Sequence, residues 1–128
     1  MKVIIAGGRE FTDPALIERA VELSGWRDEI TAVISGRANG IDTLGEHWAI
    51  GNGVPIIARP ADWKRYGLKA GPLRNALMAA DAAPDGGLIL IWSGFSRGSA
   101  NMKMEAAKKG LRKFELLVNE QYPEGMPI

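Results

Sequence analysis

The chain lacks cysteine altogether and contains a single histidine, His47. The absence of cysteine excludes disulfide bonds, thiolate metal ligands and cysteine nucleophiles. His47 has no carboxylate or thiol partners at the spacing that metal ligands require, so we expect no metal site. With 128 residues the chain is long enough to bury an apolar core without such crosslinks, and we expect one domain.

A strong excess of charge of one sign is also missing. Lysine and arginine number 16 and aspartate and glutamate 15, which leaves a formal net charge of +1. Because non-specific DNA binding depends on a strongly basic surface, we do not expect nucleic acid as the partner. The longest apolar runs, such as Leu88–Trp92, have the length of strands rather than of membrane spans. The amino terminus carries no secretion signal, so we expect a cytoplasmic protein without membrane contact.

Glycine, in contrast, is abundant, and the 16 glycines cluster after short apolar runs. Several of these runs are continuously apolar, which is typical of strands buried on both faces of a parallel sheet. The pattern predicts five strands, over Lys2–Ala6, Ile30–Ile34, Pro55–Arg59, Leu88–Trp92 and Lys113–Val118. Helical periodicity and end signals predict four helices between them, over Pro14–Ser24, Ile41–Ile50, Gly71–Ala80 and Ser99–Lys109.

Strands that alternate with helices indicate an α/β fold with right-handed crossovers. We therefore predict a single Rossmann-like three-layer domain over residues 1–118, with a five-stranded, mostly parallel sheet and helices on both faces. Residues 119–128 contain two prolines and one glycine and are expected to form an irregular tail.

In open α/β sheets, ligands bind beyond the carboxyl ends of the strands, and four polar loops of this chain follow such ends. The first loop has Gly7 and Gly8, which let the backbone approach a ligand, followed by Arg9, which is suited to an anion. The second runs from Ser35 to Asp42 and precedes a helix, so its backbone N–H groups and the helix dipole favour phosphate. This second loop matches neither the G-x-G-x-x-G fingerprint nor the P-loop.

The third and fourth loops add cations, hydroxyl groups and an aromatic side chain. The third is a long loop from Asp62 into a helix whose first turn is expected to bear Arg74 and Asn75. Its Trp63 is placed either to stack on a base or to pack as part of a lid. The fourth gathers serine hydroxyl groups, backbone N–H groups and Arg97 at a helix amino terminus. Each loop alone could be an ordinary turn, but their convergence at one sheet edge predicts a site for a phosphate-bearing ligand.

At these loops the chain resembles the SLOG superfamily, and within it the YspA-like, cpYpsA-related branch, from Met1 to about Val118. The resemblance rests on motifs in a fixed order: Ala6–Phe11, Ser35-Gly36 with Gly40 and Asp42, Pro60–Trp63, Gly71–Asn75 with Met78, and Ser96–Met102. It implies a Rossmann-like sheet that binds a nucleotide or a nucleotide derivative such as an ADP-ribose-like molecule. The branch commonly has a second glycine where this chain has Arg37, which adds an anion-pairing group.

Two more distant relatives in this superfamily leave alternative functions open. Phosphoribohydrolases of the Lonely-guy type cleave the N-glycosidic bond of nucleoside monophosphates with a glutamate, in whose place this chain has Met102. A thioether cannot transfer a proton, which leaves only Asp42 or Glu105 as nearby candidates. DNA-processing protein A has a loop similar to that from Ser35, but this chain has Asn39 where that loop has arginine. We therefore expect a small nucleotide rather than single-stranded DNA, and catalysis stays open.

These observations predict a protein that binds a phosphate-bearing nucleotide or nucleotide derivative, as a sensor, carrier or sequestering protein, without a cofactor or a metal. Relatives often form dimers through a helical face, which implies a homodimer. The predicted ligand-binding residues are Gly7, Gly8, Arg9, Ser35, Gly36, Arg37, Gly40, Asp42, Asp62, Trp63, Arg74, Asn75, Ser96, Arg97, Gly98 and Ser99.

Overall fold

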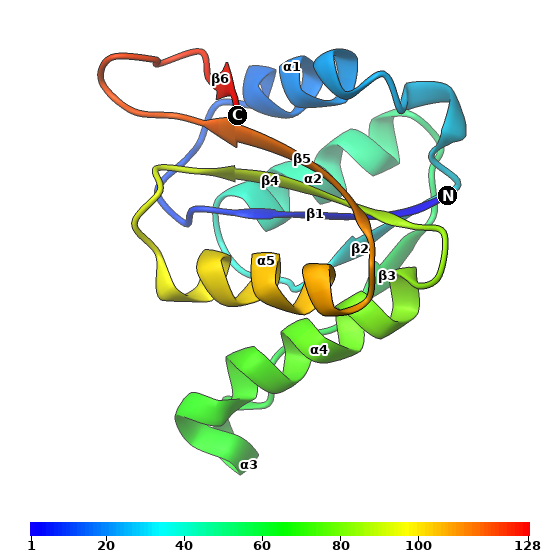
Figure 1. Ribbon diagram of the computed structural model, residues 1–128, viewed down its shortest axis with the longest axis vertical. Coiled ribbons are helices and arrows are strands. Elements are labelled where there is room, and N and C mark those ends of the chain that lie inside the picture. Colours follow the sequence, from blue (N-terminus) through cyan, green and yellow to red (C-terminus); the bar gives the residue numbers. More distant parts are fainter.

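Six strands form one central sheet in the computed structural model, which describes residues 1–128 (Figure 1). The strands are β1 (Lys2–Gly7), β2 (Ala32–Ser35), β3 (Ile56–Ala58), β4 (Gly87–Trp92), β5 (Arg112–Leu117) and β6 (Met126–Pro127). Their order across the sheet is β3-β2-β1-β4-β5-β6, with β1 to β5 parallel and β6 antiparallel to β5. The predicted Rossmann-like α/β fold is therefore confirmed, with one strand more than expected.

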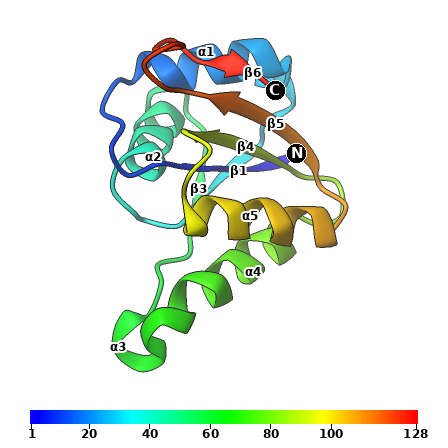
Figure 2. The same ribbon diagram turned by 60° about the vertical axis from the view of Figure 1, so that its left-hand side comes forward.

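Helices cover both faces of this sheet. The helical segments are α1 (Ala15–Ser24), η1 (Arg27–Glu29), α2 (Ile41–Gly51), α3 (Trp63–Tyr66), η2 (Gly67–Lys69), α4 (Ala70–Ala82) and α5 (Arg97–Lys108), of which η1 and η2 are 3-10 turns. α1 and α2 lie on one face, and α4 and α5 lie on the other (Figures 1 and 2). The chain moves outward from β1 to β3, then crosses to β4 on the other side of β1. Right-handed crossovers therefore place the two helix pairs on opposite faces.

Burial on both faces explains the continuously apolar strands. Val3 and Ile5 of β1 point into a core shared with α1 and α2, whereas Ile4 and Ala6 point into a core shared with α4 and α5. All six residues of β4 are buried in the same way. Central strands covered by helices on both sides have few solvent-facing positions, so the polar residues of β1 and β2, Lys2 and Ser35, lie at the strand ends.

The tail is partly ordered, which corrects the expectation of an irregular segment. β6 pairs with β5, and the Ile128 N–H donates to the Glu115 carbonyl at 3.0 Å. The Arg19 side chain donates to the carbonyl of Gly125 at 3.2 and 3.3 Å and joins the tail to α1. A strand of two residues has no periodicity that a sequence could display, because these long-range bonds determine it.

The long loop expected from Asp62 is mostly helical. The Asp62 carboxylate caps α3 by accepting a hydrogen bond from the Arg65 N–H at 3.1 Å. α4 starts at Ala70, so Arg74 and Asn75 lie in its second turn rather than its first. α3, η2 and the first half of α4 form an arm that extends beyond the sheet (Figure 2). None of the helices combines the length and the apolar character that crossing a lipid bilayer requires.

Gly45 provides the test of how closely α2 packs on β1. A Cβ at Gly45 would lie 2.8 Å from Cγ2 and 3.0 Å from Cβ of Ile5, atoms that a branched side chain cannot easily move. We expect Gly45→Ala to lower the free energy of unfolding by about 1–3 kcal/mol, as overpacking does. Gly51→Ala, in the same helix with open space around it, should be neutral or stabilising by up to about 1 kcal/mol. Urea unfolding of both variants measures the difference, and equal stabilities would contradict the packing argument.

Candidate functional site

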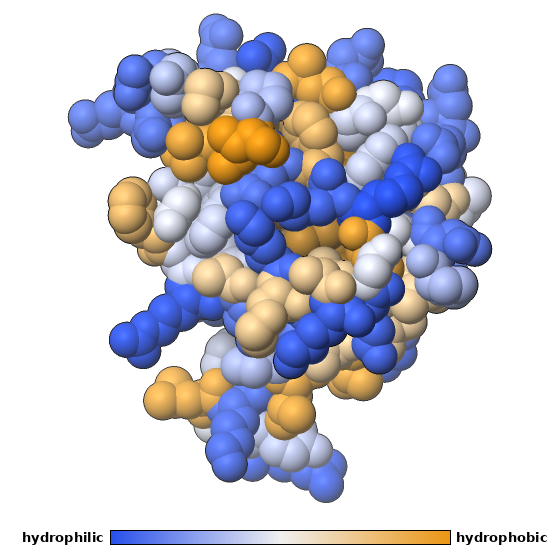
Figure 3. Space-filling view, in the orientation of Figure 1, coloured by the Kyte–Doolittle hydropathy of each residue, from blue (hydrophilic) through white to orange (hydrophobic).

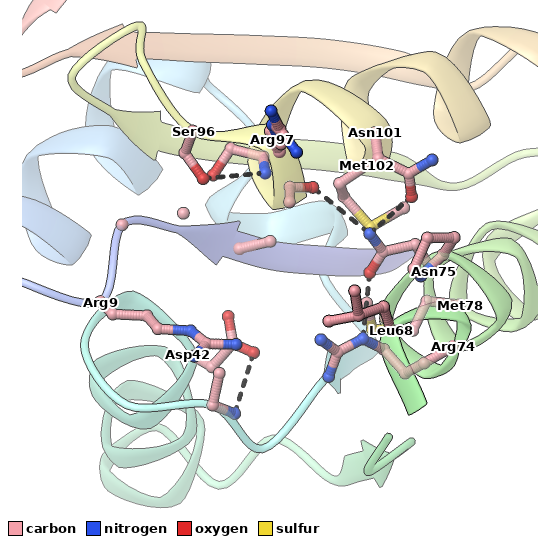
Figure 4. Close-up of a pocket in the computed structure, with 18 of the residues that line it drawn as sticks. Arg9, Asp42, Leu68, Arg74, Asn75, Met78, Ser96, Arg97, Asn101 and Met102 are labelled. Atoms are coloured by element: carbon pink, nitrogen blue, oxygen red, sulfur yellow. Dashed lines mark hydrogen bonds between the residues drawn. The ribbon is translucent and has the colours of Figure 1, made fainter. Parts of the chain in front are cut away.

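A cavity of about 510 Å³ lies at the carboxyl ends of β1 and β4, between the loops that follow them and α4 (Figure 4). Ligand pockets in proteins commonly have volumes of about 300–1,000 Å³. The cavity brings together predicted residues from all four loops, with Asp42 as the one predicted residue of the second loop: Gly7, Gly8, Arg9, Asp42, Trp63, Arg74, Asn75, Ser96, Arg97, Gly98 and Ser99.

Two predicted residues at the start of the second loop lie outside the cavity lining and form a separate polar contact. The buried Ser35 hydroxyl donates to Glu46 Oε2 at 2.6 Å and accepts from the Arg37 N–H at 3.1 Å. The Arg37 side chain points to the same carboxylate, with Nε 3.6 Å from Glu46 Oε1. Arg37 adopts φ +61°, a left-handed conformation that favours glycine, which agrees with the glycine common in the branch.

The remaining predicted residues outside the lining support the loops rather than the cavity. A Cβ at Gly40 would lie 2.3 Å from the Gly8 carbonyl oxygen, so this glycine lets the first two loops meet. A Cβ at Gly36 would lie 2.4 Å from Arg74 Nη1, so that glycine leaves room for the guanidinium. Asp62 caps α3. Local packing and capping thus account for these residue types, and contact of Gly36, Gly40 or Asp62 with a ligand stays a prediction.

Arg74 is the most firmly held cation of the cavity. Its Nη1 donates to the Gly36 carbonyl, and its Nε donates to Asn75 Oδ1 at 3.0 Å. Asn75 in turn donates from Nδ2 to Asn101 Oδ1 at 2.8 Å and to the Gly98 carbonyl at 3.3 Å. Burial lowers the pKa of Arg74, the nearby Asp42 carboxylate opposes this shift, and the like charge of Arg9 adds to it. A hydrogen-bonded chain thus links α4 to the loop after β2 and to α5.

Asp42 is a buried carboxylate that faces the cavity (Figure 4). Its Oδ2 accepts one hydrogen bond, from the Ala38 N–H at 3.2 Å. Burial raises the pKa of Asp42 to about 6, although the Ala38 hydrogen bond and the charges of Arg74 and Arg9 act in the opposite direction. A carboxyl group with a pKa near the physiological range can accept a hydrogen bond from a ligand or exchange a proton with it.

The amino terminus of α5 supplies the third polar element. Ser96 caps the helix, with its hydroxyl oxygen accepting from the Ser99 N–H at 3.2 Å and its carbonyl accepting from the Ala100 N–H at 2.9 Å. The N–H groups of Arg97 and Gly98 donate to no protein acceptor. Free N–H groups at the positive end of a twelve-residue helix suit the oxygens of a phosphate.

Sequence reasoning missed the apolar wall of the cavity. Met78 and Met102, which are singled out in the sequence only within the family motifs, are both buried and both line the cavity. Leu68, on the arm, lines it as well although it is 93% exposed, and apolar side chains are visible on this arm in Figure 3. Glu105, in contrast, does not line the cavity and pairs with Lys108 at 3.2 Å. The remaining lining residues are Ala6, Glu10, Ala38, Gly71, Pro72 and Asn101.

Comparison with known proteins identifies the family. Residues 1–66 match the model of the YspA, cpYpsA-related SLOG family. The chain is 32% identical over 117 residues to the Gene 61 protein of Mycobacterium phage D29, which covers 86% of this chain and 91% of that protein.

Among solved structures, DNA processing protein A from Streptococcus pneumoniae has a similar fold. The TM-score is 0.66 with 22% sequence identity, over 93% of this chain and 51% of that one. This chain therefore spans about half the length of that structure, and the likeness shows the fold alone. The family match over the amino-terminal half and the phage relative over most of both chains agree: the chain belongs to the YspA, cpYpsA-related SLOG family.

Proposed function

We propose that the protein binds a phosphate-bearing nucleotide or nucleotide derivative, such as an ADP-ribose-like molecule, in the cavity at the carboxyl ends of the strands. It acts as a sensor, carrier or sequestering protein. The observation that carries the proposal is the convergence of two guanidinium groups, from Arg9 and Arg74, with the free amino terminus of α5 on one cavity of about 510 Å³.

The electrostatics of the cavity favour an anion. The pKa of Arg74 is lowered by burial and by the charge of Arg9, so the charged guanidinium is costly in the absence of a negative ligand. A phosphate group in the cavity would offset this cost and could accept hydrogen bonds from the N–H groups of Arg97 and Gly98. Charge-assisted bonds of this kind are about twice as strong as neutral ones.

The apolar side chains that border the cavity are suited to the base of a nucleotide. Trp63 and Leu68 border the cavity from the arm, and Met78 and Met102 border it from the core. Trp63 is 46% exposed, which leaves its ring free to stack on a base. Its edge packs toward Gly71, where a Cβ would lie 3.2 Å from the ring, so Trp63 also has the packed position of a lid residue.

Single-stranded DNA is the second candidate, because the similar solved structure is named for DNA processing. The formal net charge of +1 offers little attraction for a polyanion. N-glycosidic hydrolysis has weaker support, since Met102 lines the cavity where the related hydrolases carry glutamate. Of the two other candidates for proton transfer, Glu105 lies outside the cavity and Asp42 lines it. A homodimer and a cytoplasmic location stay predictions.

A thermal-shift screen separates these functions. We expect AMP, ADP, ATP, NAD, ADP-ribose or a cyclic dinucleotide to raise the melting temperature, because a ligand at about a hundred times its dissociation constant adds roughly 2.7 kcal/mol of stability. Arg74→Ala and Arg9→Ala should each weaken binding of the active compound by about 10–100-fold, the loss of a charge-assisted bond. Arg65→Ala, which removes the same charge from the arm outside the cavity lining, is the control. A shift from an oligonucleotide alone, with a steep salt dependence, would favour the DNA alternative.

The burial of Asp42 makes the free energy of unfolding depend on pH. Its pKa of about 6 exceeds the ordinary value of 3.8, so the folded protein binds this proton more tightly than the unfolded chain. The proton on Asp42 therefore stabilises the folded state fully below about pH 4, and this stabilisation is lost as the pH rises through about 6. The folded and ordinary pKa values of Asp42 differ by about 2.2, which corresponds to about 3 kcal/mol in the free energy of unfolding. We therefore expect Asp42→Asn to be more stable than the wild type by up to about 3 kcal/mol at pH 8, and by only a few tenths near pH 4.

Urea unfolding at the two pH values measures this difference, with Asp85→Asn, an exposed aspartate, as the control. If Asp42→Asn gives the same change in stability at both pH values, the buried carboxylate does not titrate as described. A gain at pH 8 would also show that Asp42 is maintained at a cost to folding, which supports a role in ligand binding.

A further inference from the structure

The Asp42 carboxylate has fewer partners than its burial requires. The residue is 6% exposed, and one backbone N–H at 3.2 Å is its only hydrogen-bond donor. No lysine or arginine nitrogen lies within 4.0 Å, so Asp42 forms no ion pair despite the charges of Arg9 and Arg74 nearby. A carboxylate offers about four acceptor positions, and a buried charge without partners is costly. Oδ1, which accepts no hydrogen bond from the protein, is therefore available to a donor in the cavity.

The chemistry of this position selects the kind of ligand group. A carboxylate only accepts hydrogen bonds and repels a phosphate, so the ligand must present donors to Asp42 and its anionic part elsewhere. The amino terminus of α5 lies on the opposite side of the cavity from Asp42 (Figure 4), with the free N–H groups that suit the phosphate. The base has the apolar wall with Trp63 and Leu68. The group left for Asp42 is the sugar.

We propose that Asp42 binds the 2′- and 3′-hydroxyl groups of a ribose, so that the cavity takes ribonucleotide derivatives and discriminates against 2′-deoxyribonucleotides. This inference rests on the proposed function and specifies its ligand class. Two adjacent hydroxyl groups match the two-oxygen geometry of a carboxylate, and each donates where Asp42 lacks a partner. The 2′-hydroxyl is also the group that distinguishes ribonucleotides from DNA, so the same residue disfavours a DNA ligand.

The test compares matched pairs of nucleotides by isothermal titration calorimetry at pH 7.5: AMP with 2′-deoxy-AMP, ADP with 2′-deoxy-ADP, and ATP with 2′-deoxy-ATP. For the wild type we expect the ribose form of the best-bound pair to bind about 10–100-fold more tightly, the usual effect of a hydrogen bond to a charged group. Asp42→Asn, whose stability should exceed that of the wild type, should bind the two forms within about threefold, mainly through weaker binding of the ribose form. Asp85→Asn, which alters an exposed carboxylate outside the cavity lining, should keep the wild-type preference.

Three results would overturn the inference. Equal affinity of the wild type for both members of each pair would show that the sugar hydroxyls do not reach Asp42, and the proposed nucleotide binding would stand. A ribose preference that survives in Asp42→Asn would show that another residue recognises the hydroxyls. Failure of all six nucleotides to bind, while other compounds or an oligonucleotide bind, would overturn the ribose assignment. It would also overturn the proposal that the cavity binds simple nucleotides.

Discussion

The side chains of β1 point alternately into the two halves of the core, and Val3, Ile4 and Ile5 are at most 1% exposed. β1 lies in the interior of the sheet, with β2 on one side and β4 on the other. The chain therefore leaves β1 in one direction and returns on its other side, which places helices on both faces. The loops after β1 and β4 separate at this reversal, and the cavity lies between them.

A few polar contacts between elements hold the side chains that line the cavity in position. Asn75 joins α4 to α5 through Asn101 and Gly98, and it orients Arg74, which reaches the carbonyl of Gly36 after β2. The loop after β2 and helix α5 are thus held at fixed distances from α4 by side chains from one turn of that helix. The guanidinium is partly engaged by the protein before any ligand arrives, which lowers the entropy lost on binding.

The sequence predicts the layers of this fold well because strand and helix periodicity are local properties. Apolar runs and glycine-rich ends are sufficient to place β1, β4 and the residues Gly7, Arg9 and Ser96 at one edge. Local patterns do not contain long-range hydrogen bonds, so β6 and the Ser35–Glu46 contact could not be predicted. Met102 shows a different limit: the resemblance marks it as a thioether in the place of a glutamate, and only the three-dimensional arrangement reveals that it is buried and forms part of an apolar wall.

The edges of the sheet are both short. β3 has three residues, and β6 has two, one of which is Pro127. Proline has no N–H to donate, and such short strands present few unpaired backbone groups. β6 pairs with Leu116 and Leu117 at the end of β5, and the uncovered start of that strand carries the charged residues Arg112 and Lys113. Short strands, a proline and charged side chains at these edges thus disfavour edge-to-edge pairing with another chain.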